Sequence, residues 1–170
     1  MKIDFKIIEN RIVKSVFVKD DYIAPIILFD NDEEASHKYL EIENGKTEIA
    51  EFSFNAYSKE LACFQLVGCT QFSIKDNDME IPIFREGSIL INTLDNEDNY
   101  GVADFNSEKF ITEIYKNGLC TIFSDDEIEK SVKSGNIILS FGSENNLVRI
   151  YVVDLSYSDL IHIKKVFSNG

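Results

Sequence analysis

Residues 38–55 read KYLEIENGKTEIAEFSFN, and this stretch decides the fold. Its central pair, Asn44-Gly45, is a dipeptide typical of a two-residue type I′ turn between antiparallel strands. Apolar and polar residues alternate on both sides of the pair, as they do in strands with one buried face. The stretch therefore predicts a β-hairpin with strands from Lys38 to Glu43 and from Lys46 to Asn55.

Each strand of this hairpin has one face suited to a hydrophobic core. Successive side chains of a strand point to opposite sides of the sheet. The first strand divides into an apolar face, Leu40 and Ile42, and a second face, Tyr39, Glu41 and Glu43. Phe52 and Phe54 share one face of the second strand, and we expect both to be core residues.

Strand patterns extend from the hairpin through most of the first hundred residues. Runs that alternate or are rich in Val, Ile and Phe predict strands at 2–7, 12–18, 22–29, 61–74, 80–84, 88–94 and 100–105. Pro25 lacks a backbone donor, so the run at 22–29 should lie at a sheet edge or contain a bulge. Gly68 is a candidate for a bend within the run at 61–74.

The second half of the chain mixes helices with strands. Ser107 can cap a helix over 108–116, and Ser124 with Glu127 is a capping box for another helix. Strands follow at 137–141 and 147–154, and a last helix covers 158–167. This order predicts an α+β fold with a largely antiparallel sheet and two or three helices in the C-terminal half. The length of 170 residues suits a single domain, residues 1–170.

The chain is strongly acidic along its whole length. Lys and Arg total 17 and Asp and Glu total 30, a net charge of −13. Residues 1–85 hold 10 basic and 16 acidic side chains, and residues 86–170 hold 7 and 14, so neither half alone carries the charge. Such a domain repels nucleic-acid phosphates and anionic membranes and attracts basic partners. The alternative reading is that the charge serves only solubility.

No catalytic, metal-binding or cofactor motif is visible. The three cysteines, Cys63, Cys69 and Cys120, lack CxxC spacing, and the two histidines, His37 and His162, lie far apart in sequence. Neither a glycine-rich phosphate loop nor a G-x-S-x-G nucleophile elbow occurs. We therefore expect no catalytic residue, no metal and no cofactor, and we interpret His162 as a satisfied packing residue.

An acidic loop comes nearest to a metal-binding motif. Asp30, Asp32, Glu34 and Glu41 fall at the spacing of an EF-hand loop, but Ala35 stands where the sharp turn needs Gly. The flanking segments also read as strands instead of helices. The loop is thus interpreted as solvated acids between two strands.

The N-terminal segment and the cysteine content favour a cytoplasmic protein. Residues 1–14 read MKIDFKIIENRIVK, and their charged residues interrupt any apolar signal-peptide region. No run of 18 apolar residues occurs in the chain. With no export signal, we expect the three cysteines to be reduced thiols.

Acid is most concentrated in residues 76–108, which contain nine acidic side chains against the single base Arg85. Short turns carry many of these acids, so they could gather at one edge of a sheet. The candidate partner-binding residues are Asp76, Asp78, Glu80, Asp95, Glu97, Asp98, Tyr100 and Asp104. Charge complementarity makes this stretch a candidate surface for a basic protein. The alternative is a set of ordinary solvated turns.

In size, acidity and lack of chemical motifs the chain resembles bacterial immunity proteins, such as those that neutralise nuclease toxins of contact-dependent inhibition systems. The resemblance lies in the overall character of the chain and assigns no role to any residue. It implies an inhibitor that covers a basic toxin domain. Two further hypotheses stay open: a DNA-mimic or anti-restriction protein, and a small ligand-binding domain or enzyme without a recognisable motif.

Overall fold

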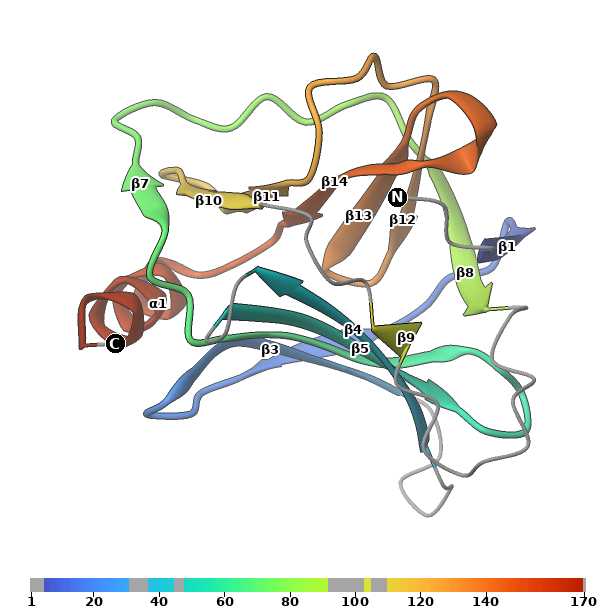
Figure 1. The fold of residues 1–170 in the computed structure, drawn as a ribbon, viewed down its shortest axis with the longest axis horizontal. Coiled ribbons are helices and arrows are strands. Elements are labelled where there is room, and N and C mark those ends of the chain that lie inside the picture. Colours follow the sequence, from blue (N-terminus) through green and yellow to red (C-terminus); the bar gives the residue numbers. More distant parts are fainter. Residues whose placement is uncertain (1–4, 31–36, 45–47, 92–102, 105–109, 170) are drawn as a thin grey trace.

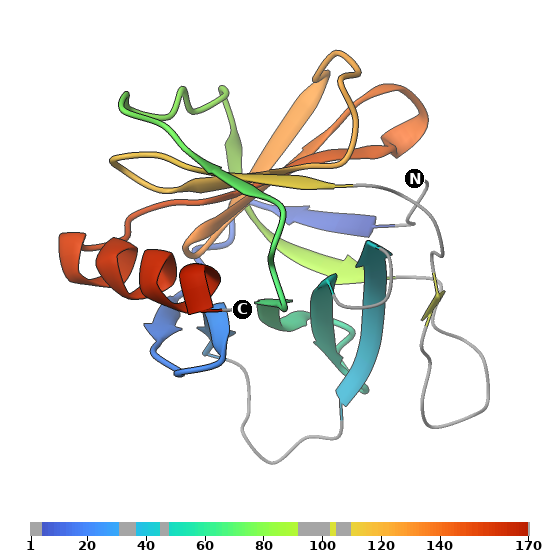
Figure 2. The same ribbon diagram turned by 60° about the vertical axis from the view of Figure 1, so that its left-hand side comes forward.

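The computed structural model describes residues 5–30, 37–44, 48–91, 103–104 and 110–169. Two β-sheets face each other, and one α-helix lies against one end of the pair (Figures 1 and 2). Because 54% of the described residues are in strands, the fold is mostly β. The expected α+β class with two or three helices is therefore wrong, since the described residues contain a single α-helix, at the C-terminus.

The larger sheet has eight strands in the order β1-β8-β12-β13-β14-β11-β10-β7. It is mixed, because β10 pairs with β7 and β12 with β8 in parallel, whereas the other pairs are antiparallel. Its strands are β1 (Phe5–Glu9), β7 (Phe72–Ile74), β8 (Arg85–Ile91), β10 (Ile111–Ile114), β11 (Leu119–Ile122), β12 (Lys130–Ser134), β13 (Ile137–Phe141) and β14 (Leu147–Val152). A short 3-10 helix, η1 (Ser143–Asn145), joins the last two.

The smaller sheet has six strands in the order β2-β3-β6-β5-β4-β9. Its first five strands pair antiparallel, and the two-residue β9 joins β4 in parallel at the edge. The strands are β2 (Ser15–Val18), β3 (Ile23–Phe29), β4 (His37–Asn44), β5 (Glu48–Asn55), β6 (Leu61–Val67) and β9 (Ala103–Asp104). Across both sheets antiparallel pairing predominates, as expected from the sequence.

The hydrophobic core lies between the two sheets. Leu40, Phe52, Phe64 and Ile27 form one cross-strand row of the six-stranded sheet, and each is at most 1% exposed. They belong to one cluster of buried side chains that also includes residues of the eight-stranded sheet and of the helix. Phe5 makes an edge-to-face contact with Phe52, with ring centroids 6.2 Å apart. The sheets therefore pack face to face through aromatic and aliphatic side chains.

The predicted hairpin is present, but its register differs from the prediction. A two-residue turn at Asn44-Gly45 would pair Glu43 with Lys46. Instead β4 continues through Asn44, which pairs with Glu48, and the three residues between them lie outside the described part of the chain. The predicted type I′ turn is thus wrong. The consequence is that Leu40 lies opposite Phe52, which places both apolar faces of the hairpin on the core side.

The predicted helix over 108–116 is wrong, because Ile111–Ile114 is strand β10. Its first residues, 108 and 109, lie outside the described chain. Phe110, Thr112 and Ile114 are buried, whereas Ile111 is 52% exposed, which is the period of a strand. The Thr112 hydroxyl, buried between the sheets, is 3.2 Å from the hydroxyl of Thr121 on β11. The apolar residues of this segment also fit the spacing of a helix, but pairing with neighbouring strands decides for a strand.

The helix predicted after Ser124 is also wrong. Ser124 accepts a hydrogen bond from the backbone N–H of Asp126, a local turn contact, and the chain then enters β12 as a strand. On such a helix Lys133 would lie one turn after Glu129, but its Nζ instead donates to Asp154 at 2.7 Å. Ser, Thr and Asp side chains favour turns as well as helix caps, so a capping box alone does not secure a helix.

Most predicted strands are confirmed, with some boundary changes. The run at 22–29 became β3, which is interior and has an irregular register between Ile23 and Ile26, so the bulge was correct and the edge was not. The run at 61–74 divides at Gly68 (φ 63°) into β6 and β7, which belong to different sheets. The run at 80–84 forms no strand, and of 100–105 only β9 is described.

The C-terminal helix α1 (Tyr157–Asn169) confirms the helix expected over 158–167. It buries Leu160, Ile163, Val166 and Phe167 in the core. In the described residues, no helix is both long and apolar enough to span a bilayer.

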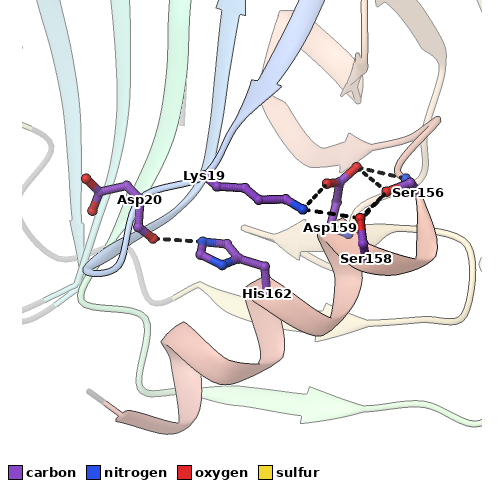
Figure 3. A network of polar contacts seen from close by, with 6 residues as sticks. All are labelled: Lys19, Asp20, Ser156, Ser158, Asp159 and His162. Carbon is purple, nitrogen blue, oxygen red and sulfur yellow. Dashed lines mark hydrogen bonds and ion pairs between the residues drawn. The ribbon is translucent and has the colours of Figure 1, made fainter.

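Polar contacts attach α1 to the turn between β2 and β3 (Figure 3). Lys19 Nζ lies 3.3 Å from Asp159 Oδ1 and donates to Ser158 Oγ at 3.2 Å. His162 Nε2 donates to the backbone carbonyl of Asp20 at 2.8 Å, and the His162 ring also meets Phe17 edge-on. His162 is therefore a hydrogen-bonded packing residue, in agreement with its interpretation from the sequence.

Candidate functional site

The predicted acidic surface begins on the connection between β7 and β8. This connection runs along the outside of the eight-stranded sheet (Figure 1, green, top). Met79 is buried against the sheet together with Cys120 and Tyr151, whereas Asp76, Asp78 and Glu80 are exposed. The alternation of Met79 with these acids holds the three carboxylates in solvent.

The other predicted partner-binding residues lie elsewhere or outside the described chain. Asp104 is in β9 at the edge of the six-stranded sheet, where it is in register with Glu41. Asp95, Glu97, Asp98 and Tyr100 fall outside the described residues. The described candidates thus belong to two separate parts of the fold, and the structure does not bring them into one patch.

A more concentrated arrangement occurs on the outer face of the six-stranded sheet, which is the face turned away from the core. No described helix or strand lies over this face (Figure 1). Two neighbouring cross-strand rows define it. The glutamate row is Glu41, Glu51, Gln65, Ile26 and Val18, and the Cys63 row is Tyr39, Ser53, Cys63, Leu28 and Val16.

The glutamate row contains two carboxyl groups directly opposite each other. Glu41 and Glu51 form a cross-strand pair, a position at which like charges destabilise a sheet. Burial, followed by the negative charge of Glu41, raises the pKa of Glu51. Gln65 Nε2 donates to Glu51 Oε1 at 2.7 Å, which favours the ionised form but does not overcome the rise. A positive charge placed near the two carboxyl groups would therefore stabilise their ionised forms.

The Cys63 row borders a hollow with a volume of about 530 Å³. Its floor includes Ser53 and Ala62, which are 5% and 6% exposed, and its wall includes Leu28 and Val16, which are 42% and 60% exposed. This volume falls in the range of sites that hold a small ligand or a large side chain. Exposed aliphatic side chains beside a hollow are typical of binding surfaces.

The Cys63 thiol in the hollow is not activated as a nucleophile. Cys63 and His37 both line it. Burial and the charge of Glu51 raise the pKa of Cys63 to about 12, so the thiol is protonated at neutral pH. A protonated thiol is a weak nucleophile and a small apolar contact surface.

A second hollow lies where β8 and β12 diverge. It has a volume of about 610 Å³ and is lined by residues 82–85 and 128–132 together with Ile7 and Glu9. Ile83 at its rim is 98% exposed. Arg85 pairs with Glu9 there, at 2.8 Å. This hollow therefore offers an apolar side chain and a charge pair that is already satisfied.

Sequence reasoning missed the outer face, although one signal was present. Glu41 was placed on the polar face of its strand, but a two-residue turn would have paired it with Glu48 instead of Glu51. Glu48 is in fact buried, and its carboxylate accepts hydrogen bonds from Thr70 and Gln71. An outward-facing β3 residue such as Leu28 could have been found from the alternation in 22–29, because Ile27 and Phe29 are the buried neighbours.

Comparison with models of known protein families gives no match to this chain. Comparison with curated protein sequences gives no significant match either.

Proposed function

We propose that this protein binds and neutralises a basic protein, in the manner of an immunity protein that blocks a nuclease-type toxin domain. The observation that carries the proposal is the outer face of the six-stranded sheet. There a cross-strand pair of glutamates lies beside exposed aliphatic side chains and a hollow.

The composition of this face supports a protein partner. An antiparallel sheet with one solvated face normally alternates apolar side chains inward with polar ones outward. Here Ile26, Leu28 and Val16 point outward and meet Cys63 and Gln65 across the strands. A mixed apolar and charged patch of this kind resembles the core and rim of a protein interface.

The charge of the chain supports a basic partner. A net charge of −13 attracts a positively charged protein at long range and raises its association rate. The same field opposes binding to nucleic acid. Binding should therefore weaken as salt concentration rises, chiefly through slower association.

The test is co-expression with the polypeptide encoded by the adjacent gene. If that polypeptide is a basic toxin, the protein should restore growth and co-purify with it at low salt, and the association rate should fall at high salt. Growth arrest that persists on co-expression, with no complex at low salt, contradicts the proposal.

Paired variants locate the surface in the same assay. Glu41→Lys with Glu51→Lys should abolish protection. Asp76→Lys with Asp78→Lys adds the same positive charge on the outside of the other sheet and should leave protection largely intact. If only the second pair abolishes protection, the partner binds the predicted acidic stretch instead.

A further inference from the structure

Resting on the proposed function, we infer which part of the basic partner the outer face recognises. We propose that it takes an extended segment with an Arg or Lys two positions from a large apolar side chain. The cation lies between Glu41 and Glu51, and the apolar side chain enters the hollow beside Cys63.

The spacing of the two rows sets the spacing of the ligand. Ser53 follows Glu51 by two positions on β5, and Cys63 precedes Gln65 by two positions on β6. Residues two apart on a strand point to the same side and lie about 7 Å from each other. The negative charge of Glu51 is also one cause of the raised pKa of Cys63, as expected for groups on neighbouring rows. Residues i and i+2 of an extended ligand have the same separation.

The glutamate pair favours a cation of the ligand over other groups. The groups that shift the pKa of Glu51 are its burial, Glu41 and Gln65, and no cation from the described residues is among them. A guanidinium or ammonium group placed between the carboxyl groups would replace repulsion with two charge-assisted hydrogen bonds. Arg suits the site best, because its planar donors can reach two acceptors at once.

The hollow favours an apolar side chain beside that cation. Ala62, Leu28 and Val16 supply its apolar surface. The Cys63 thiol is protonated and adds no charge. An aromatic or branched side chain that fills such a hollow is the usual anchor of a protein interface. A second copy of this chain is a poor occupant, because two copies meeting here would oppose their own glutamate pairs.

The test uses three synthetic peptides of Ser residues, each of which carries one Phe. In the first peptide Arg stands two positions before Phe, in the second the two are adjacent, and in the third Gln replaces Arg. Backbone amide NMR spectra are recorded while each peptide is added to the whole protein. The first peptide should shift the amides of β5 and β6 and bind at least about tenfold more tightly than the other two.

Two variants separate the contribution of the glutamate pair to peptide binding from that of the hollow. Glu41→Gln with Glu51→Gln should lower the affinity for the first peptide at least about tenfold but leave the affinity for the third peptide unchanged. Leu28→Ser changes an exposed residue in the wall of the hollow. It should lower the affinity for all three peptides, because each carries Phe. The glutamine variant loses repulsion and should fold at least as stably as the parent, so lost binding there does not reflect unfolding.

The outcomes separate this inference from the proposed function. Equal binding of the three peptides, or shifts confined to another surface, overturns the inference. If the basic partner is still neutralised in that case, the proposed function stands and its surface lies elsewhere. If the first peptide binds as expected but no basic protein is neutralised, the inferred peptide specificity of the outer face stands and the proposed function fails. Binding of free phenylalanine as tightly as the first peptide would overturn the inference in favour of a small-molecule site.

Discussion

Glu41 on β4 and Glu51 on β5 face each other directly across the antiparallel pair, with the side chain of Gln65 bonded to one of them. Two like charges in one cross-strand position cost the sheet stability. Proteins commonly accept such local costs where a surface binds something. The relationship therefore links the stability of the fold to its proposed use, and both can be measured.

Replacing Glu51 with Gln should stabilise the protein by about 0.5 kcal/mol at neutral pH, because the repulsion disappears while the backbone pairing remains. The sign of the pH dependence follows from the raised pKa of Glu51. The folded state holds this proton more tightly than the unfolded state, so the parent loses stability as pH rises from the usual value of 4.5 through the raised pKa. Urea unfolding across this range should show a flatter profile for Glu51→Gln.

The matched control is Glu43→Gln, which removes one charge from the same face of β4. Glu43 pairs with Ile49 and has no carboxyl group opposite it. Its replacement should leave both the stability at neutral pH and the pH profile nearly unchanged. Equal gains in the two variants would mean that general charge reduction, and not the cross-strand pair, sets the effect.

Replacing Glu48 with Ala should destabilise the fold by about 3 kcal/mol, because buried donors lose their acceptor. Glu48 is 2% exposed and accepts hydrogen bonds from Thr70 N (2.6 Å), Thr70 Oγ1 (2.5 Å) and Gln71 N (2.6 Å). The second carboxylate oxygen accepts from Asn44 Nδ2 at 2.5 Å. Thermal unfolding followed by circular dichroism measures the loss. A cost under about 1 kcal/mol would show that water can substitute for these contacts.

The three cysteines should resist alkylation in the folded protein. Burial raises the pKa of Cys63 and of Cys120 to about 12 and that of Cys69 to about 11. For Cys63 the rise from 9.0 to about 12 lowers the thiolate fraction about a thousandfold at a given pH. Iodoacetamide labelling followed by mass spectrometry should be slow in buffer and fast in denaturant.

The Glu51→Gln variant provides an internal check on the labelling. The charge of Glu51 is the second cause of the raised pKa of Cys63, and it does not contribute at Cys120. The variant should therefore speed labelling of Cys63 and leave Cys120 unchanged. Rapid labelling of Cys63 in the parent protein would contradict the raised pKa of that thiol.

Removing the cap of α1 should cost about 1 kcal/mol. The Asp159 N–H donates to Ser156 Oγ at 3.2 Å, and Ser156 Oγ donates in return to Asp159 Oδ2 at 2.6 Å. Burial opposes ionisation of Asp159, yet the hydrogen bonds from Ser156 and the contacts with Lys19 hold its pKa below the usual 3.8. This contribution is present above pH 3.8 and fades as pH falls through the lowered pKa.

The measurement for this cap is a comparison of Asp159→Asn and Ser156→Ala by thermal unfolding at neutral and acidic pH. Both variants should be less stable than the parent at neutral pH, and the difference for Asp159→Asn should shrink in acid. Ser168→Ala, at the other end of the helix, is the control and should have little effect. A difference that grows in acid would contradict the lowered pKa of Asp159.

Several local features could be read from the sequence because they depend only on nearby residues. The alternation along 38–55 indicated strands with a core face, and Leu40 and Phe52 are indeed buried. The helix predicted over 158–167 is confirmed as α1: Leu160, Ile163 and Phe167 recur at helical spacing, and such a period has few competing explanations. Short mixed patterns failed: Phe110 and Ile114 fit both a helix and a strand, and only pairing with β11 and β7 decided between them.

By itself, the sequence determined that the protein is acidic, rich in strands and ended by a helix, since composition and periodicity are local properties. It could not determine which acids would meet. That depends on register: Asn44 pairs with Glu48, where a two-residue turn would pair Glu43 with Lys46, and this three-position shift moves Glu41 from a position opposite Glu48 to one opposite Glu51. Packing against the second sheet favours this register, because it places Leu40 directly opposite Phe52 with both side chains in the core. The tertiary structure therefore decides that, among many acidic residues, Glu41 and Glu51 lie opposite each other beside a hollow.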